Sequence, residues 1–366
     1  MKRFVLLLIV IVALSFGYSC KKESVLPESE IEPSELFKIM GFNSNNSFID
    51  SKGSLFFPWG FNYTNPVKVG LIEDNWAMES TWTTFDEDFS EMRNYGANIV
   101  RIHLQYNKFM IDKATPNTLA LNNLKRFVEL AEVNGLYLDI TGLSAYRKTD
   151  APDWYDNLKD SERWKTHAIF WKNVAATIGS SKAVFSYNLM NEPVVAVGCE
   201  DDEECDWLPG DGFGGFHFIQ NIARDPNLVY GTAMKDWIEQ LTASIRSEDS
   251  ETMITVGFLG LGPINDLGSD LEYLSLHIYP KSGELQTAVD KVENSQTSKP
   301  LVLEETSNLN CGIEELKTFL DDIDGNYNGL MGHYFGKTLA DMQESTAITD
   351  ALHTEFLEFF IANNPN

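Results

Sequence analysis

The chain has 366 residues and a formal net charge of −26 at pH 7. A charge of this sign and size repels phosphate backbones and anionic lipid surfaces, so it argues against a nucleic acid partner and against direct adhesion to a membrane. Hydrophobic residues make up 43% of the sequence and include 23 Phe and 8 Trp, which is ample for a large core.

The N-terminus has the pattern of a secretory signal. Two basic residues precede an apolar run over residues 4–16, which is too short to span a bilayer, and small residues precede Cys20. We expect residues 1–19 to be removed on export. Cys20 resembles the lipidated cysteine of a bacterial lipobox, with ordinary cleavage as the alternative, and residues 20–35 are rich in Glu, Ser and Pro, as in a flexible tether. The predicted location is the outer membrane or periplasm, or the cell surface, with the lipid as the only membrane contact.

Residues 36–366 show strand-like and helix-like segments in alternation and are interpreted as one domain. After a hairpin whose turn is at residues 50–53, the predicted strands are residues 55–63, 98–104, 136–141, 183–190, 253–258, 271–279, 301–305 and 329–335. The predicted helices are residues 85–95, 119–133, 162–178, 232–246, 285–292, 313–323 and 349–362. Eight such strands favour a closed (β/α)8 TIM barrel, and no glycine-rich nucleotide motif follows the first strand to favour an open sheet.

A long loop, residues 194–228, follows the fourth predicted strand. In it, Cys199 and Cys205 flank five acidic residues, and in an oxidising compartment we expect a disulfide between them. Calcium binding by the acidic run is the alternative. The glycine and aromatic mixture at residues 212–218 predicts a binding loop. No Cys and His spacing suggests zinc, and neither a metal nor a cofactor is expected.

Two predicted strands end in glutamates. The fourth ends in Asn191 and Glu192 before a proline, and the seventh ends in Glu304 and Glu305. In a parallel barrel these ends face one another across the mouth, where active sites lie. A pair of carboxyl groups suits the cleavage of a glycosidic bond, because one protonates the leaving oxygen while the other attacks the anomeric carbon or activates water. A solvated loop glutamate is the simpler alternative for Glu192.

Supporting residues accompany the pair. Asn191 suits a hydrogen bond to a sugar hydroxyl, and Arg101 suits an ion pair that keeps the attacking carboxylate charged. Because successive strand residues point to opposite faces, only one of Glu304 and Glu305 is expected to face the mouth.

Four motifs in order resemble those of a retaining glycoside hydrolase of family five, the cellulase and mannanase family. They are an Asn-x-Val-Arg strand ending at Arg101, Asn-Glu-Pro at residues 191–193, a His-x-Tyr strand end at His277 and Tyr279, and a proline followed by four residues and Glu305. The resemblance implies that Glu192 is the acid/base and Glu305 the nucleophile. It implies that Tyr279 donates to the nucleophile and that His277 lines the pocket near the acid/base. Glu304 would then point into a helix interface or toward solvent.

The sequence departs from the family pattern in two places. The eighth strand lacks the usual sugar-stacking tryptophan, and we expect Tyr334 or Phe335 to substitute for it. The third strand has Thr141 and Tyr146 where many members carry a histidine. Specificity for cellulose or mannan therefore cannot be carried over. The candidate sugar-binding residues, each with core or loop packing as the alternative, are Trp59, Trp82, His103, Trp207 and Tyr334.

The sequence thus predicts a secreted, lipid-anchored hydrolase that cleaves a β-linked polysaccharide or oligosaccharide with retention of configuration. The first alternative is a carbohydrate-binding surface lipoprotein without activity, against which the presence of both glutamates argues. The others are a transglycosylase with the same residues and, more remotely, a metal-dependent hydrolase.

Overall fold

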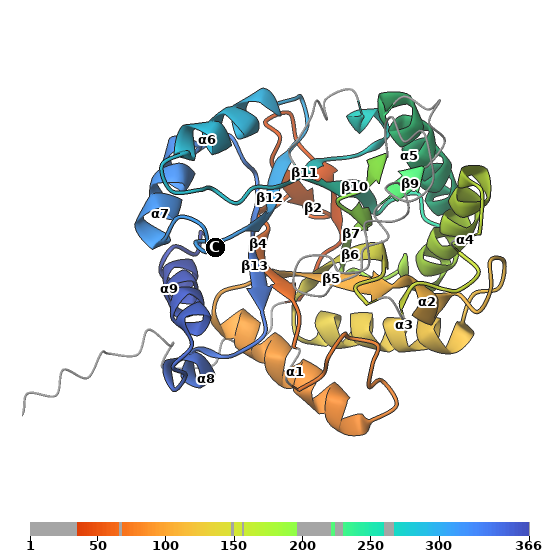
Figure 1. Cartoon of the computed structure of the whole chain (residues 1–366), viewed down its shortest axis with the longest axis horizontal. Helices are drawn as coiled ribbons and strands as arrows, with labels where there is room; N and C mark the ends of the chain where they lie inside the picture. Colours follow the sequence, from red (N-terminus) through yellow and green to blue (C-terminus); the bar gives the residue numbers. More distant parts are fainter. Residues whose placement is uncertain are drawn as a thin grey trace, which may run out of the picture.

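Eight parallel strands close into a barrel. The computed structural model describes residues 35–65, 68–147, 150–155, 157–195, 221–223, 230–259 and 267–365, apart from the side chains of Asn221, Tyr230 and Tyr334. The strands follow one another around the barrel in chain order (Figure 1). They are β4 (Trp59–Tyr63), β5 (Ile99–Gln105), β6 (Tyr137–Ser144), β7 (Val184–Asn191), β10 (Met253–Phe258), β11 (Leu274–His277), β12 (Leu301–Thr306) and β13 (Leu330–Phe335). The predicted (β/α)8 fold and all eight predicted strands are confirmed.

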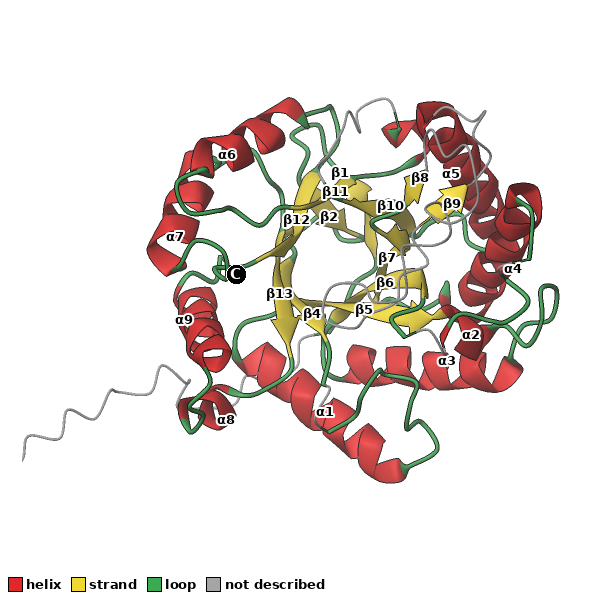
Figure 2. Ribbon diagram, in the orientation of Figure 1, coloured by secondary structure: helices red, strands yellow, loops and turns green. Residues whose placement is uncertain are grey.

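Helices surround the barrel as an outer layer (Figure 2). The predicted helices are all present as α1 (Glu79–Asn94), α3 (Thr118–Val133), α4 (Asp160–Ile178), α5 (Tyr230–Arg246), α6 (Leu285–Asn294), α7 (Ile313–Asp322) and α9 (Ile348–Ala362). Short helices not predicted are α2 (Tyr106–Phe109), α8 (Leu339–Gln343) and the 3-10 helix η3 (Gly268–Asp270). None of the described helices combines the length and the apolar character needed to cross a membrane.

The barrel strands are covered on both faces, which explains their nearly continuous apolar sequences. Several of their residues are nevertheless polar and fully buried. They are Arg101, Gln105, Asp139, Thr141, Ser186, Asn188, Thr255, Ser275, Glu304 and Thr306. Because a buried polar group without partners is costly, these side chains require hydrogen bonds with one another.

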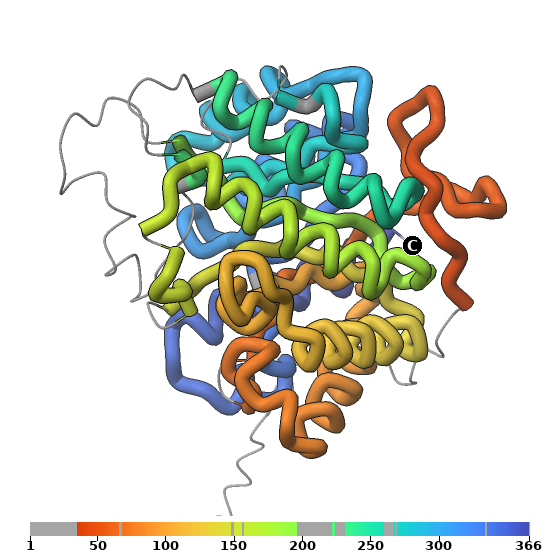
Figure 3. Tube along the Cα trace, turned by 90° about the vertical axis from the view of Figure 1, so that its right-hand side faces the viewer, coloured from red at the N-terminus to blue at the C-terminus, as the bar shows by residue number. Residues whose placement is uncertain are grey.

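A small antiparallel sheet covers one end of the barrel. It consists of β1 (Ile39–Phe42), β2 (Phe48–Asp50) and β3 (Leu55–Phe56), and it confirms the predicted hairpin with β1 added. Phe48 packs against Phe185 of β7 and Tyr273, which precedes β11, at 5.2 and 5.4 Å between ring centroids. These contacts are made where the barrel strands begin, and Figure 3 shows the N-terminal segment in red at that end. The sheet therefore closes the barrel opposite the mouth.

Of the predicted long loop, the structure describes β8 (Val194–Val195) and β9 (Asn221–Ala223), which pair in parallel. The predicted disulfide between Cys199 and Cys205, the acidic run between them and the glycine-rich binding loop lie outside the described residues, as does Cys20 with the signal and most of the tether.

The packing of Phe48 predicts a large loss of stability in Phe48→Ala. Removal of a fully buried ring should lower the free energy of unfolding by about 3–5 kcal/mol, as measured by denaturant unfolding. Leu55→Ala in the same sheet is the control, because Leu55 is 72% exposed. Equal losses in the two variants would contradict the role given to Phe48.

Candidate active site

The guanidinium of Arg101 lies inside the barrel and is fully buried. Its Nε donates to Thr141 Oγ1 at 2.8 Å, and Nη1 donates to Asn62 Oδ1 at 2.7 Å. It also pairs with two carboxylates, those of Glu305 at 2.5 Å and Glu304 at 3.3 Å. Burial lowers the pKa of Arg101, but the charges of both carboxylates outweigh burial and raise it, so the side chain remains a cation.

Glu305, the predicted nucleophile, lies near the end of β12 with 8% of its surface exposed. Tyr279 donates its hydroxyl to Glu305 Oε2 at 2.6 Å, which is the contact expected from the family resemblance. Burial would raise the pKa of Glu305, but the charges of His277 and Arg101 outweigh burial and hold it below its usual range. The carboxylate is therefore ionised and fixed by donors at both oxygens, as a nucleophile requires.

Glu192, the predicted acid/base, follows β7 directly and has a left-handed backbone with φ of 50°. Residues other than glycine rarely adopt this conformation, and it persists where the surroundings fix it. Here the amide of Glu192 donates to the carbonyl of Gly257 at 2.8 Å. The preceding Asn191 accepts from Arg101 through Oδ1 at 3.0 Å. The backbone of β10 and the buried cation together hold Glu192 at the mouth.

His277 lies between the two glutamates. Its Nδ1 is 2.8 Å from Glu192 Oε1 and 3.6 Å from Glu305 Oε2. One carboxylate oxygen of each glutamate and a ring nitrogen of His277 all lie within 4.8 Å of one another. Burial would lower the pKa of His277, but the charge of Glu305 and hydrogen bonds with Glu192 and Glu304 raise it to about 9. A cation therefore stands between the carboxyl groups.

The predicted orientation of Glu304 was wrong. Its side chain is fully buried inside the barrel, where Oε2 accepts from Asn188 Nδ2 at 2.8 Å. The cause is a register shift: Leu276 and His277 of β11 pair with Leu303 and Glu305, so Glu304 is an extra residue in β12. The pairing of β12 with β13 skips one residue in the same way. This β-bulge interrupts the alternation of side-chain direction along the strand, on which the prediction was based. Both glutamates can therefore face inward.

Sequence reasoning missed three residues of the site. Asn62 donates from Nδ2 to the carbonyl of Glu304 at 2.8 Å and so satisfies the bulged backbone. Asn188 binds the side chain of Glu304, as described above. His333 contacts the hydroxyl of Tyr279 through Nδ1 at 2.7 Å and lies 3.9 Å from Glu305. The available signal was their position, since each is polar and lies in a barrel strand.

Two of the candidate sugar-binding residues lie in the core and not at the mouth of the barrel. Trp59 is 4% exposed and stacks on Phe360 with centroids 4.6 Å apart, and Trp82 is 4% exposed and donates to the carbonyl of Trp76, so both predictions were wrong and both residues pack in the core. Trp59 is the first residue of β4 and so lies at the end far from the mouth, while Trp82 faces inward from α1.

The remaining candidates lie at the mouth or outside the described part. His103 is half-buried in β5 and contacts the hydroxyl of Tyr146 and, at 3.5 Å, Asn62. Phe335 is 1% exposed and packs in the core, so it does not replace the missing tryptophan. Trp207 and the side chain of Tyr334 lie outside the described residues.

The same cluster bears on metal binding. Glu192, His277 and Glu305 are the one group of described residues with donor atoms close enough to share an ion. Both ring nitrogens of His277 already face carboxylates, at 2.8 and 3.1 Å. An imidazole that donates at both nitrogens has no lone pair for a metal. The arrangement is therefore suited to hold a proton.

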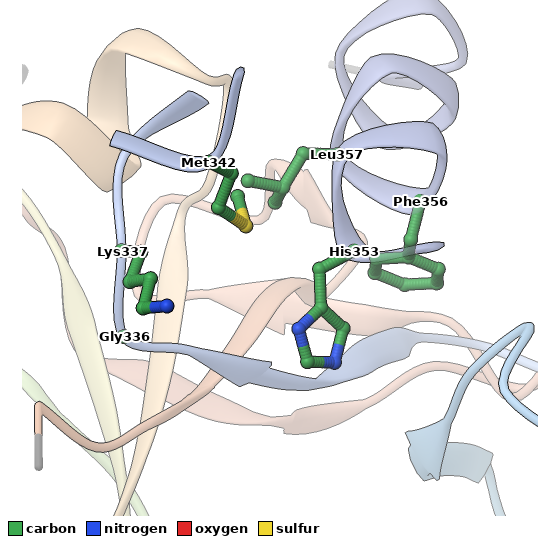
Figure 4. Close-up of a pocket in the computed structure, with 6 residues that line it drawn as sticks. All are labelled: Gly336, Lys337, Met342, His353, Phe356 and Leu357. Atoms are coloured by element: carbon green, nitrogen blue, oxygen red, sulfur yellow. The ribbon is translucent and has the colours of Figure 1, made fainter. Parts of the chain in front are cut away.

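A pocket outside the barrel shares no residue with this cluster. It lies between the segment after β13, α8 and α9 (Figure 4), and its lining residues are Gly336, Lys337, Met342, His353, Phe356 and Leu357. Lys337 donates to Asp350 at 2.7 Å. The titratable groups suited to catalysis are at the mouth of the barrel.

A closed (β/α)8 barrel with paired glutamates at the ends of its fourth and seventh strands defines a barrel glycoside hydrolase as the class of this protein. The model of the family described as Cellulase (glycosyl hydrolase family 5) matches residues 61–300, which is more than half of the chain. The chain therefore belongs to glycosyl hydrolase family 5, and the resemblance inferred from its motifs is confirmed. The match includes Arg101, Glu192 and His277 and ends before Glu305, which the structure places beside them.

Solved structures share the fold. The exo-β-1,4-mannosidase from Opitutaceae bacterium strain TAV5 has a TM-score of 0.63 and 16% identity. The alignment covers 88% of this chain and 61% of the mannosidase chain. The β-mannanase from the blue mussel Mytilus edulis has a TM-score of 0.58 and 15% identity, with 91% and 98% covered. The catalytic domain of a Thermobifida fusca endoglucanase in complex with cellotetraose has a TM-score of 0.57 and 12% identity. The alignment covers 88% of this chain and 97% of that domain. Comparison with curated proteins finds no match.

Gly257 is expected to be intolerant of a side chain. A Cβ there would lie 2.7 Å from Glu304 Oε2 and from His277 Nε2 and 3.0 Å from Arg101 Nη2. Gly257→Ala should therefore lower the free energy of unfolding by about 1–3 kcal/mol and kcat by about a hundredfold. Gly231→Ala is the control, because a Cβ at Gly231 meets nothing within 4 Å. Denaturant unfolding and sugar release measure the two effects, and full activity in Gly257→Ala would contradict the packing.

Stability should fall as the pH rises above neutral. The folded-state pKa of His277 is raised to about 9, so its contribution is complete below the unfolded pKa of about 6.5 and is lost as the pH rises through 9. The expected loss is about 3 kcal/mol, measured by urea unfolding across this range. His277→Gln should show a flatter dependence. The same slope in both proteins would show that another group causes the loss.

Proposed function

We propose that this protein is a retaining β-glycosidase that hydrolyses a β-linked polysaccharide or oligosaccharide, with Glu305 as the nucleophile and Glu192 as the acid/base. The observation that carries the proposal is the short gap between their carboxylates, one oxygen of each lying within 4.8 Å of the other. Retaining enzymes hold the two groups about 5–5.5 Å apart, whereas inverting enzymes leave about 6.5–9.5 Å for a water molecule.

In the first step Glu305 attacks the anomeric carbon while Glu192 gives its proton to the glycosidic oxygen. The bond to the leaving sugar breaks and a glycosyl ester forms on Glu305. In the second step the ionised Glu192 removes a proton from water, whose oxygen attacks the same carbon and releases the Glu305 carboxylate. The two displacements each invert the anomeric centre, so the product keeps the configuration of the substrate.

Arg101, His277 and Tyr279 support both steps through their contacts with Glu305. They stabilise its charge before attack and again when the carboxylate leaves the glycosyl ester. Asn191 directs its Oδ1 to Arg101. Its amide NH2 is thus the group available for a sugar hydroxyl next to the reacting carbon.

The substrate we propose is a neutral β-linked glycan. The net charge of −26 disfavours a strongly anionic chain. Support also comes from the family description, which is that of a cellulase, and from the named activities of the structural neighbours, which are a mannosidase, a mannanase and an endoglucanase. His333 lies 3.9 Å from Glu305, and His103 contacts Asn62, which binds Arg101. Both histidines are proposed to contact the sugar in place of the missing tryptophan.

We further propose that the protein is exported and anchored through a lipid on Cys20. The support is the basic and apolar pattern of residues 1–19 and the tether of residues 20–35. In a bacterial host, metabolic labelling with a fatty acid should mark the full chain. The variant Cys20→Ala should take up no label, and equal labelling of both would contradict the anchor.

The test of the proposed function is sugar release from a panel of plant, algal and microbial polysaccharides. The mature protein should cut one glycan, and Glu305→Ala and Glu192→Gln should each lose at least about a hundredfold in kcat. NMR of the first products should show the anomeric configuration of the substrate.

Three results would require another function. Binding of a glycan by the protein and both variants without cleavage would indicate a carbohydrate-binding protein. Longer oligosaccharides at high substrate concentration would indicate a transglycosylase. Loss of activity in chelator would indicate a metal-dependent reaction.

A further inference from the structure

We propose that Glu304 is a positioning residue of the acid/base catalyst: it holds His277 as an imidazolium whose Nδ1–H donates to Oε1 of Glu192, so that the proton used in catalysis sits on the other oxygen of Glu192. This inference rests on the proposed function, because it assigns Glu192 the role of acid/base. It adds a residue that has no contact with the substrate and acts through His277.

The first support is the number of donors that converge on one oxygen of Glu304. Its Oε2 accepts from Asn188 at 2.8 Å, faces Nε2 of His277 at 3.1 Å and lies 3.3 Å from Nη2 of Arg101. The side chains of Glu304, His277 and Arg101 are each 0% exposed. A carboxylate with three buried donors is a strong and fixed acceptor.

The second support is the geometry of His277. Both ring nitrogens lie at hydrogen-bond distance from carboxyl oxygens, Nδ1 from Glu192 at 2.8 Å and Nε2 from Glu304 at 3.1 Å. A neutral imidazole carries a single N–H, so one of these contacts would set two lone pairs against each other unless the carboxyl group supplied the proton. The imidazolium satisfies both contacts as donor.

A different proton arrangement also fits the distances. Glu192 could carry its proton on Oε1 and donate to Nδ1 of a neutral His277, which would turn that proton away from the substrate. The charge of Glu304 opposes this arrangement, because an anion 3.1 Å from Nε2 in a buried site favours a cationic ring. Glu304 thereby determines which oxygen of Glu192 protonates the leaving group.

The third support is the state of Asp139, the neighbour of Glu304 in the barrel. Among the residues that the structure describes, no N–H or hydroxyl group donates to the buried oxygens Asp139 Oδ1 and Glu304 Oε1. A proton between the two carboxyl groups satisfies both oxygens. Burial and the charge of Glu304 raise the pKa of Asp139 well above its usual range, so Asp139 keeps this proton and donates it in a hydrogen bond. Glu304 remains the anion.

The buried charges then balance. The cations Arg101 and His277 face the anions Glu304 and Glu305, and Asp139 is neutral. The titratable or charged groups that face His277 from the surrounding elements are Glu192, Glu304, Glu305, Arg101, His103 and His333. The set is balanced without Glu192, so the pairing of His277 does not depend on a charge on Glu192.

The experiment is a 15N NMR titration of the full mature protein labelled at histidine, with the His277 signals identified by their loss in His277→Gln. In the wild type both ring nitrogens should be protonated from about pH 5 to about pH 8. A neutral His277 at about pH 6 would overturn the proposal. This measurement requires neither a substrate nor a further variant. The protonation state of His277 is therefore tested independently of the proposed function.

The second arm uses Glu304→Gln, which keeps the shape of the side chain and removes its charge. His277 should lose its proton at a pH about two units lower than in the wild type, so that its protonated fraction at about pH 8, and with it kcat/KM, falls about tenfold relative to about pH 5. Asp139→Asn retains a donor to Glu304 and should leave His277 protonated. Glu314→Gln removes one charge from the surface, where Glu314 is 81% exposed, and should leave the pH profile unchanged.

An unchanged His277 titration and pH profile in Glu304→Gln would overturn the proposal, whatever the absolute activity. If the wild type cuts no glycan, the proposed function fails, and the NMR titration still decides the state of His277. If Glu304→Gln does not fold, the wild-type titration decides alone.

Discussion

The buried guanidinium of Arg101 is the constraint on which the rest of the site depends. A cation inside a barrel must be paired, and removal of a partner from such a pair costs about 3–5 kcal/mol. Arg101 is satisfied by groups from β4, β6, β7 and β12, so the ends of these strands can occupy only positions that keep its hydrogen bonds. The same bonds hold Glu305 ionised and Asn191 oriented. The contacts that pair the buried charge of Arg101 are therefore the same contacts that orient the catalytic residues.

Irregularities in the backbone place the glutamates near Arg101. The bulge in β12 turns both Glu304 and Glu305 inward, and a similar shift in β7 precedes Asn191. Glu192 then adopts φ of 50° and is fixed by the carbonyl of Gly257. Regular strands would present every second residue to the mouth, whereas these departures bring adjacent polar residues to one place.

Much of this molecule was predictable from sequence because the repeating pattern is strong. The eight barrel strands are short apolar runs with polar ends, and helices such as α3 have buried residues at the expected spacing. The motifs also predicted the meeting of Glu192, Glu305, Arg101, His277 and Tyr279, since strand ends of a parallel barrel converge.

The wrong predictions concern the orientation and burial of side chains, which the residue types alone do not determine. Glu304 was placed outside because strand alternation was assumed, and a bulge leaves no mark in the residue types. Trp59 and Trp82 were candidate sugar platforms, but an aromatic residue in a core and one in a cleft look alike in sequence. The residue type of His333 likewise does not reveal its role, because its contact with Tyr279 joins β13 to the segment after β11.

We propose that the charge arrangement around Arg101 makes Glu305, and not its neighbour Glu304, a covalent nucleophile. The most direct measurement uses an activated 2-deoxy-2-fluoro glycoside of the sugar that the enzyme releases, because the fluorine slows the second step and the glycosyl ester accumulates. Mass spectrometry of the digested protein should locate one sugar on Glu305. A sugar on Glu304, or turnover with inversion and no bound sugar, would show that Glu305 is not the nucleophile.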